Sequence, residues 1–183
     1  VRDAGTRRWK AIFVGQSVNV GDELRTGRFS GLSIVLADET QLRLHRRSRL
    51  TIDSAGSGDG ARRSSLSLAA SSLWSRARSV FRNITGKLGP QRPLLFLRTP
   101  AATIGIRSTD WHVRVDSNGA TELTVLSGRA ELANDLGRVD VSSGQGGQAA
   151  KGRVPTSSTI VNLRDRPLIV LELDHDWHEL LRL

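Results

Sequence analysis

The sequence has 183 residues, with 27 Lys and Arg against 18 Asp and Glu, and it contains no cysteine. This length suffices for one domain with its own hydrophobic core, and the lack of cysteine excludes disulfides, zinc ribbons, iron–sulfur clusters and thiol nucleophiles. The net charge of +9 fits an acidic protein partner, an anionic envelope surface or nucleic acid, and does not choose among them.

The chain has no methionine and begins with Val1, so we expect it to be part of a longer protein. A signal peptide or a membrane anchor could then lie outside these 183 residues. Within them, the longest apolar run, at 167–173, has the length of a strand and falls far short of the roughly 20 residues that a membrane span needs.

Short segments in which apolar and polar residues alternate follow one another along the chain. This period of two is typical of strands that bury one face. The segments are 32–36, 41–52, 65–68, 94–99, 111–115, 122–126, 129–132 and 138–141. Clusters rich in Gly, Asp, Asn and Ser separate them, at a spacing that is typical of all-β folds. The clusters are 21–22, 28–31, 37–40, 116–119, 126–129, 134–137 and 142–147.

Three stretches depart from this pattern. Residues 53–65 are small and polar, which predicts a loop. Residues 73–88 fit a strand to about Arg78, followed by a loop or one short helix near 79–88. The end of the chain predicts a last strand at 164–173 and then a helical turn or an exit linker.

The predicted fold class is all-β, with short antiparallel hairpins stacked in a solenoid-like arrangement and a β-sandwich as the alternative. A weak similarity between residues 31–52 and 120–141 favours the stack, because both segments have a strand–turn–strand form. We expect residues 1–155 to form one β domain. Residues 156–183 would then be a C-terminal strand and exit segment, either part of that domain or a linker to a further module.

Four blocks of sequence, taken in order, resemble the FecR domain family. That family combines a Gly-Asp strand, an Asp-Gly-Ser hairpin, a Thr-Pro segment that leads to Arg-Gly-Thr and an aromatic residue, and a Gly-Gln turn. The resemblance spans about residues 14–153, and its blocks are 14–52, 66–79, 96–132 and 137–152.

The chain departs from the family pattern at three glycines. Ser108 replaces the glycine of Arg-Gly-Thr, Glu39 replaces that of Asp-Gly-Ser, and Ala70 stands where another glycine is usual. Each change predicts a backbone that avoids strongly positive φ at that position.

The resemblance implies a non-catalytic, periplasmic or otherwise extracytoplasmic module of the bacterial cell envelope. In one branch of the family, such a domain receives a signal from an outer-membrane transducer and passes it to a cytoplasmic sigma factor. In other branches it stands on secreted or anchored proteins beside peptidoglycan-binding modules. The expected function is therefore signal transduction through protein–protein contacts, and the alternative is a scaffold that binds glycan or peptidoglycan.

The expected partner is an envelope protein such as an outer-membrane receptor or transducer, with an anionic cell-wall polymer as the second candidate. Residues 60–109 hold nine basic residues and no acid, which suits an acidic partner. Nucleic acid is not expected, because this stretch has few aromatic residues on which bases could stack. The candidate docking residues are Arg76, Arg78, Arg82, Arg98, Arg107, Thr109 and Trp111. The competing interpretation is that Trp111 fills the core and that the arginines lie on solvated strand faces.

No catalytic or cofactor-binding residue is predicted. The chain has no Gly-x-Ser-x-Gly motif, and residues 144–147 lack the Lys-Ser/Thr of a phosphate loop and fit a β-turn. His175 and His178 are weak candidates for metal ligands, because on a helix they would share a face with Glu179. The preferred interpretation is a solvated polar tail.

Overall fold

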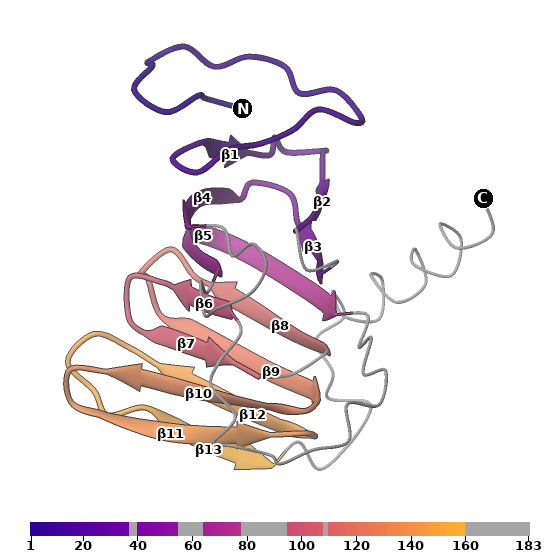
Figure 1. The fold of residues 1–183 in the computed structure, drawn as a ribbon. Coiled ribbons are helices and arrows are strands. Elements are labelled where there is room, and N and C mark those ends of the chain that lie inside the picture. The colour runs from indigo at the N-terminus through magenta and orange to yellow at the C-terminus, as the bar shows by residue number, and fades with distance from the viewer. Residues whose placement is uncertain (37–39, 55–63, 78–94, 108–109, 160–183) are drawn as a thin grey trace.

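The computed structural model describes residues 1–36, 40–54, 64–77, 95–107 and 110–159. All regular elements within these ranges are β-strands (Figure 1). The first six are β1 (Glu23–Arg25), β2 (Leu32–Val35), β3 (Thr40–Leu44), β4 (Arg49–Ser54), β5 (Ser64–Ala77) and β6 (Leu95–Arg98). The other seven are β7 (Thr103–Ile106), β8 (Asp110–Val115), β9 (Thr121–Ser127), β10 (Arg129–Asn134), β11 (Gly137–Ser142), β12 (Gln145–Ala149) and β13 (Thr156–Thr159).

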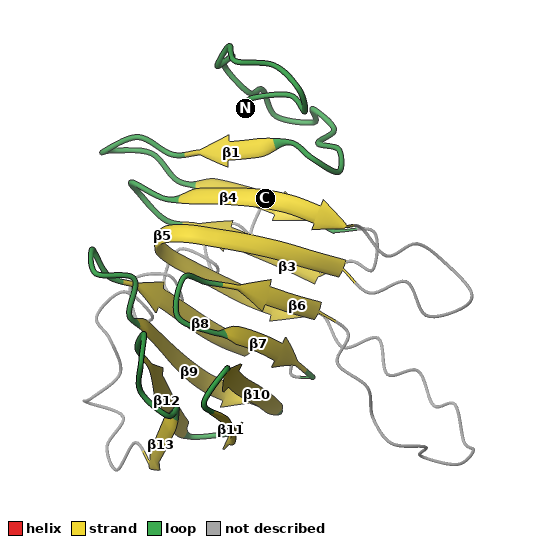
Figure 2. Cartoon of the chain, turned by 90° about the vertical axis from the view of Figure 1, so that its left-hand side faces the viewer, coloured by secondary structure: helices red, strands yellow, loops and turns green. Residues whose placement is uncertain are grey.

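The strands form two facing sheets that share β5. Sheet A runs in the order β1, β4, β5, β6, β7, β10 and β11. Sheet B runs in the order β2, β3, β5, β8, β9, β12 and β13. The two sheets face each other along the length of the molecule (Figures 1 and 2). Every strand pair is antiparallel except that of β5 with β6.

Strand β5 belongs to both sheets because it is much longer than the others, with 14 residues. Its first half, as far as Ala70, pairs with β4 and β6 in sheet A. Its second half pairs with β3 and β8 in sheet B. The predicted strand that ends near Arg78 corresponds to this half, which the structure follows to Ala77.

After β5 the chain alternates between the sheets, one hairpin at a time. The hairpin β6–β7 lies in sheet A, β8–β9 in sheet B, β10–β11 in sheet A and β12–β13 in sheet B. Each new hairpin pairs with the previous one of the same sheet, β10 with β7 and β12 with β9. The prediction of an all-β stack of antiparallel hairpins is therefore confirmed.

The hydrophobic core fills the space between the sheets, and the alternating pattern of the sequence supplies it. In β8, for example, Trp111, Val113 and Val115 are buried while Arg114 is exposed. Removing such side chains from water contributes roughly 1.5–3 kcal/mol each. The largest fully buried side chains are Trp111, Leu24, Leu42, Leu44, Leu50, Leu66, Leu68, Leu73, Leu97, Ile104 and Leu123.

The turn at 116–119 shows how the polar clusters shape the stack. The Asp116 carboxylate accepts hydrogen bonds from the backbone N–H groups of Asn118 (2.8 Å) and Ala120 (2.9 Å). Gly119 has φ of +80°, a conformation that side chains other than glycine rarely adopt. The turn predicted at 116–119 therefore connects β8 to β9 in a hairpin.

The prediction of a β-turn at residues 144–147 is wrong for three of its four residues. The turn is at Ser143 and Gly144, and β12 begins at Gln145. Gly147 lies inside β12, at a position where the core leaves no room for a side chain. A Cβ atom on Gly147 would stand 2.8 Å from Val141 Cγ2 and 3.1 Å from Leu132 Cδ2.

Residues 53, 54, 64 and 65 of the predicted loop are in strands instead, since β4 continues to Ser54 and β5 starts at Ser64; residues 55–63 lie outside the described residues. Ala70 pairs with Arg49 beside a shift in register between β4 and β5. Strand β13 lies in the segment 156–183 and extends sheet B.

The predicted short helix near 79–88, the last strand at 164–173, the C-terminal helical turn, Glu39 and Ser108 lie outside the described residues. In the part of the chain that the structure describes, no helix is long and apolar enough to cross a membrane.

Candidate docking surfaces

The structure describes only part of the predicted docking set. Arg98, at the end of β6, and Arg107, just after β7, are both exposed. They lie at opposite ends of the hairpin β6–β7, because Arg98 pairs with Thr103 at the turn and Arg107 follows Ile106 at the open end. The backbone N–H of Arg107 donates to the carbonyl oxygen of Arg129 (3.0 Å). The structure therefore does not bring these two arginines together in one patch.

Trp111 is 1% exposed and lies in the core between the sheets. This is the packing role that the sequence also allowed, and it leaves no part of the ring for contact at the surface. Arg76 lies in β5 opposite Asp110 of β8. Arg78, Arg82, Thr109, His175 and His178 lie outside the described residues. Among the residues that are described, no three His, Asp or Glu side chains gather into a metal site.

His112 is the buried titratable group of sheet B. It stands between Trp74 of β5 and Thr124 of β9 in the register, and it points away from Trp111 because neighbours in a strand face opposite sides. Burial, together with the charges of His45 and Arg114, lowers the pKa of His112 to about 4. Among the described residues, no group forms a hydrogen bond with its Nε2 atom. His112 is therefore neutral at pH 7.

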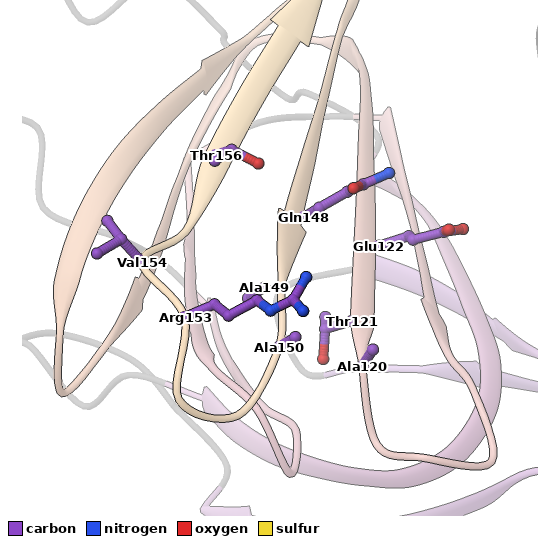
Figure 3. Close-up of a pocket in the computed structure, with 9 residues that line it drawn as sticks. All are labelled: Ala120, Thr121, Glu122, Gln148, Ala149, Ala150, Arg153, Val154 and Thr156. Atoms are coloured by element: carbon purple, nitrogen blue, oxygen red, sulfur yellow. The ribbon is translucent and has the colours of Figure 1, made fainter.

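Two hollows mark the two ends of the stack. Near its C-terminal end, a hollow of about 230 Å³ lies beside β9, β12 and the loop that leads to β13. Arg153 reaches into it from that loop (Figure 3). Glu122, at its rim, is already paired with Arg114 (2.7 Å). The lining residues other than Arg153 and Glu122 are neutral, so this hollow presents one arginine.

The larger hollow, about 510 Å³, lies near the N-terminal end and is open to solvent. Four of its eight lining residues are arginines, and the full set is Arg25, Thr26, Gly27, Arg28, Arg47, Ser48, Arg49 and Ala69. We call it the arginine groove. This groove was not predicted from the sequence, because its arginines come from two separate segments outside the basic stretch 60–109. The richness of residues 1–49 in basic groups, ten against five acids, was the available signal.

Segment 1–22 covers β1 at the end of the stack (Figure 1), and its Trp9 contacts Arg25 of the groove. Trp9 of this segment carries two stacked guanidinium groups, with Arg25 Cζ 4.3 Å and Arg2 Cζ 5.2 Å from the ring centroid. The Arg2 side chain also forms an ion pair with Glu23, and the backbones of the two residues form an isolated antiparallel β-bridge. The end of the stack is thus closed by an aromatic ring between arginines.

The described acids of this end are engaged with groups of the chain itself. Asp3 pairs with Lys10 and raises the pKa of that lysine. Asp22 accepts hydrogen bonds from the backbone N–H groups of Ala4 (3.0 Å) and Asn19 (2.8 Å). Glu23 binds both Arg2 and Arg49. Little negative charge remains to neutralise the other arginines of the groove.

The described residues define the class of fold, which is an all-β stack of hairpins in two sheets. The model of the FecR protein family matches residues 22–131, which is more than half of the chain. The chain therefore belongs to the FecR family, and this match includes all residues that line the arginine groove.

Solved structures with the same fold include two crystal structures of a proposed anti-sigma factor from Parabacteroides distasonis ATCC 8503, at 1.65 and 2.50 Å resolution. Each has a TM-score of 0.56 and 10% sequence identity to this chain. The similarity covers 75% of this chain and 59% of the other, so the chain spans less than two thirds of that protein. No curated protein matches the sequence.

Proposed function

We propose that this chain is a non-catalytic signalling module of the bacterial cell envelope that acts in the regulation of a sigma factor through protein–protein contacts. The observation that carries the proposal is the FecR match over residues 22–131, which coincides with the stacked fold from β1 to β10. The structural neighbour, a proposed anti-sigma factor, supports the same role.

In this proposal the module works outside the cytoplasm, and its partner is an envelope protein such as an outer-membrane receptor or transducer. The arginine groove at the N-terminal end of the stack is the docking surface of this proposal, because its four arginines are exposed. The charge distribution supports an acidic partner, since the arginines of the N-terminal end have few acids of their own to bind.

A transcription experiment in the source organism tests this role. The gene is replaced in frame by a version that lacks residues 22–159, and transcripts are compared with those of the parent and of a strain that carries the intact gene again. We expect one set of promoters with a common recognition sequence to change and to recover with the intact gene. Immunoblotting of the shortened protein controls for its loss.

The alternative, a scaffold that binds peptidoglycan or another glycan, gives a different result. In that case the transcripts remain unchanged, and the purified chain sediments with isolated cell-wall sacculi. This pair of results would overturn the signalling proposal.

A further inference from the structure

The arginine groove is built by two loops that hydrogen bonds hold against each other. The Thr26 N–H donates to the Ser48 carbonyl oxygen (3.0 Å), and the Arg47 N–H donates to that of Gly27 (2.9 Å). The Thr26 hydroxyl accepts from the Ser48 N–H (2.9 Å) and donates to the His45 carbonyl oxygen (2.5 Å). The groove therefore exists before any ligand arrives, which reduces the entropy lost on binding.

The polar residues that tie the loops are buried, whereas the arginines around them are not. Thr26 is 6% and Ser48 1% exposed, while Arg25, Arg28, Arg47 and Arg49 are all exposed. Their positions leave the charged groups facing solvent on a fixed backbone.

Arg47 has a backbone conformation that is unusual for its residue type. Its φ is +54°, whereas the other described residues with positive φ are glycines. Such a conformation costs a non-glycine residue energy and persists where the surroundings impose it. The bond from the Arg47 N–H to Gly27 is part of those surroundings. Turn geometry alone would favour glycine or asparagine at this position. An arginine here therefore contributes a charged side chain to the groove that the turn itself does not require.

Aromatic rings hold two of the guanidinium groups by their faces. Arg25 stacks on Trp9, and Arg28 Cζ lies 5.2 Å from the centroid of the Phe29 ring. Stacking uses the face of the guanidinium plane and leaves its N–H edge for a planar, two-oxygen acceptor. Within the described residues, Arg25, Arg28 and Arg47 have no acidic partner, unlike Arg49, whose Nε lies 3.0 Å from Glu23 Oε1.

From this arrangement we infer that the arginine groove binds an acidic peptide segment of a partner protein. Carboxylates of the peptide bind Arg25, Arg28 and Arg47, as the Glu23 carboxylate already binds Arg49 at the same groove. Phe29, 90% exposed beside Arg28, offers a contact for an apolar side chain between the acids. A peptide of mixed acidic and apolar residues complements both features, whereas a phosphate polymer complements the charge alone.

The inference rests on the proposed function in one respect, namely that the partner is a protein. Its test uses the purified chain and a defined probe. The probe is a fluorescein-labelled peptide of sequence Glu-Glu-Leu-Glu-Glu-Leu-Glu-Glu, and its binding is followed by fluorescence anisotropy. The same peptide with glutamine at each glutamate is the uncharged control, and inorganic polyphosphate serves as a competitor.

The groove variant is Arg28→Gln with Arg47→Asn, because asparagine tolerates the backbone conformation of Arg47. The matched control removes two exposed arginines at the other end of the stack, Arg129→Gln with Arg138→Gln. We expect the groove variant to bind the acidic peptide at least about tenfold more weakly, since each charge-assisted hydrogen bond is strong. The control variant should bind within about twofold of the unchanged chain, and the glutamine peptide should not bind.

Equal weakening in both double variants would show attraction to net charge only and would overturn the inference. So would polyphosphate that binds the groove more tightly than the peptide does. Circular dichroism and the unfolding midpoint of each variant confirm that it is folded. The two experiments test the two proposals separately. If the peptide binds to the groove but the transcripts do not change, the inference about the groove is supported and the signalling proposal is not. If the transcripts change but the peptide does not bind, the signalling proposal is supported and the inference about the groove is wrong.

Discussion

The two ends of the stack are closed in different ways. At the N-terminal end, residues 1–22 cover β1, and side chains tie the loops of the arginine groove together. At the C-terminal end, β11 and β13 are the last strands of the two sheets among the described residues, and all four residues of β13 are exposed. Within the described residues, only the N-terminal end carries this additional structure. Ligand binding supplies an explanation for it.

The charges of the two ends differ in the same direction. Residues 129–159 contain four basic and three acidic residues, close to balance, and their edge strand β11 alternates Arg138 and Asp140 with uncharged residues. Charges on an edge strand oppose pairing with other chains. Residues 1–49 have twice as many basic as acidic groups. One end thus discourages contact and the other favours an acidic partner.

The largest effect should come from the core that both ends share. Replacement of Trp111 by alanine removes the largest fully buried side chain, and we expect the free energy of unfolding to fall by about 3–5 kcal/mol. Chemical denaturation followed by circular dichroism measures this. Amide hydrogen exchange should accelerate at both ends together; acceleration at one end only would mean that the ends do not share one core.

A pH titration addresses the centre of sheet B. The pKa of His112 is about 4 in the folded chain, whereas its ordinary value is 6.5, so the unfolded chain binds more protons between these limits. The free energy of unfolding should therefore decrease as the pH falls from about 6.5 to 4, by up to about 3 kcal/mol from this residue. His112→Asn should flatten that part of the stability curve. An identical slope in both proteins would contradict a buried neutral His112.

Thr26→Val tests the N-terminal end alone. Valine keeps the shape of threonine but leaves the buried Ser48 N–H without the hydroxyl that accepts its hydrogen bond. We expect a loss of about 1–3 kcal/mol and faster hydrogen exchange in residues 25–49, with little change at 129–159. Thr26→Ser, which retains the hydroxyl, is the control. Peptide binding should weaken in the valine variant, because the loops are no longer tied.

Gly147→Ala is the corresponding change at the C-terminal end. Its Cβ atom would stand 2.8 Å from Val141 Cγ2, so the Val141 side chain or the backbone of β12 must shift. Overpacking of this kind costs about 1–3 kcal/mol, and we expect the lower part of that range because the obstacles are side chains. Exchange should accelerate in 129–159, and peptide binding should remain unchanged. Gln148→Ala, at an exposed position of the same strand, should have almost no effect.

Much of this fold follows from local pattern. Leu42 and Leu44 are buried as their alternation predicts, and the Asp-Ser-Asn-Gly cluster at 116–119 forms the expected turn. The pattern shows which face of a strand is buried but not which strand lies beside it. The alternation of hairpins between two sheets, and the shared strand β5, depend on pairings between distant residues. Gly147 was missed because a glycine carries no apolar side chain, so β12 has no alternation to detect.

The candidate site was less predictable than the fold. Sequence reasoning weighted the contiguous basic stretch 60–109, whereas the groove joins Arg25 and Arg28 to Arg47 and Arg49 across about twenty residues of chain. The positive φ of Arg47 leaves no mark on composition or periodicity. Trp111 illustrates the opposite case, because an aromatic residue in a basic context can still be core.

The passage of β5 through both sheets has a mechanical consequence. A force applied to the N-terminal strands of sheet A and to the last strands of sheet B acts on one continuous backbone, because both sheets hold β5 by hydrogen bonds. Neither sheet can slide along the other without tearing β5 from its neighbours. When the domain is stretched in an optical trap, we therefore expect one unfolding event in the force–extension curve.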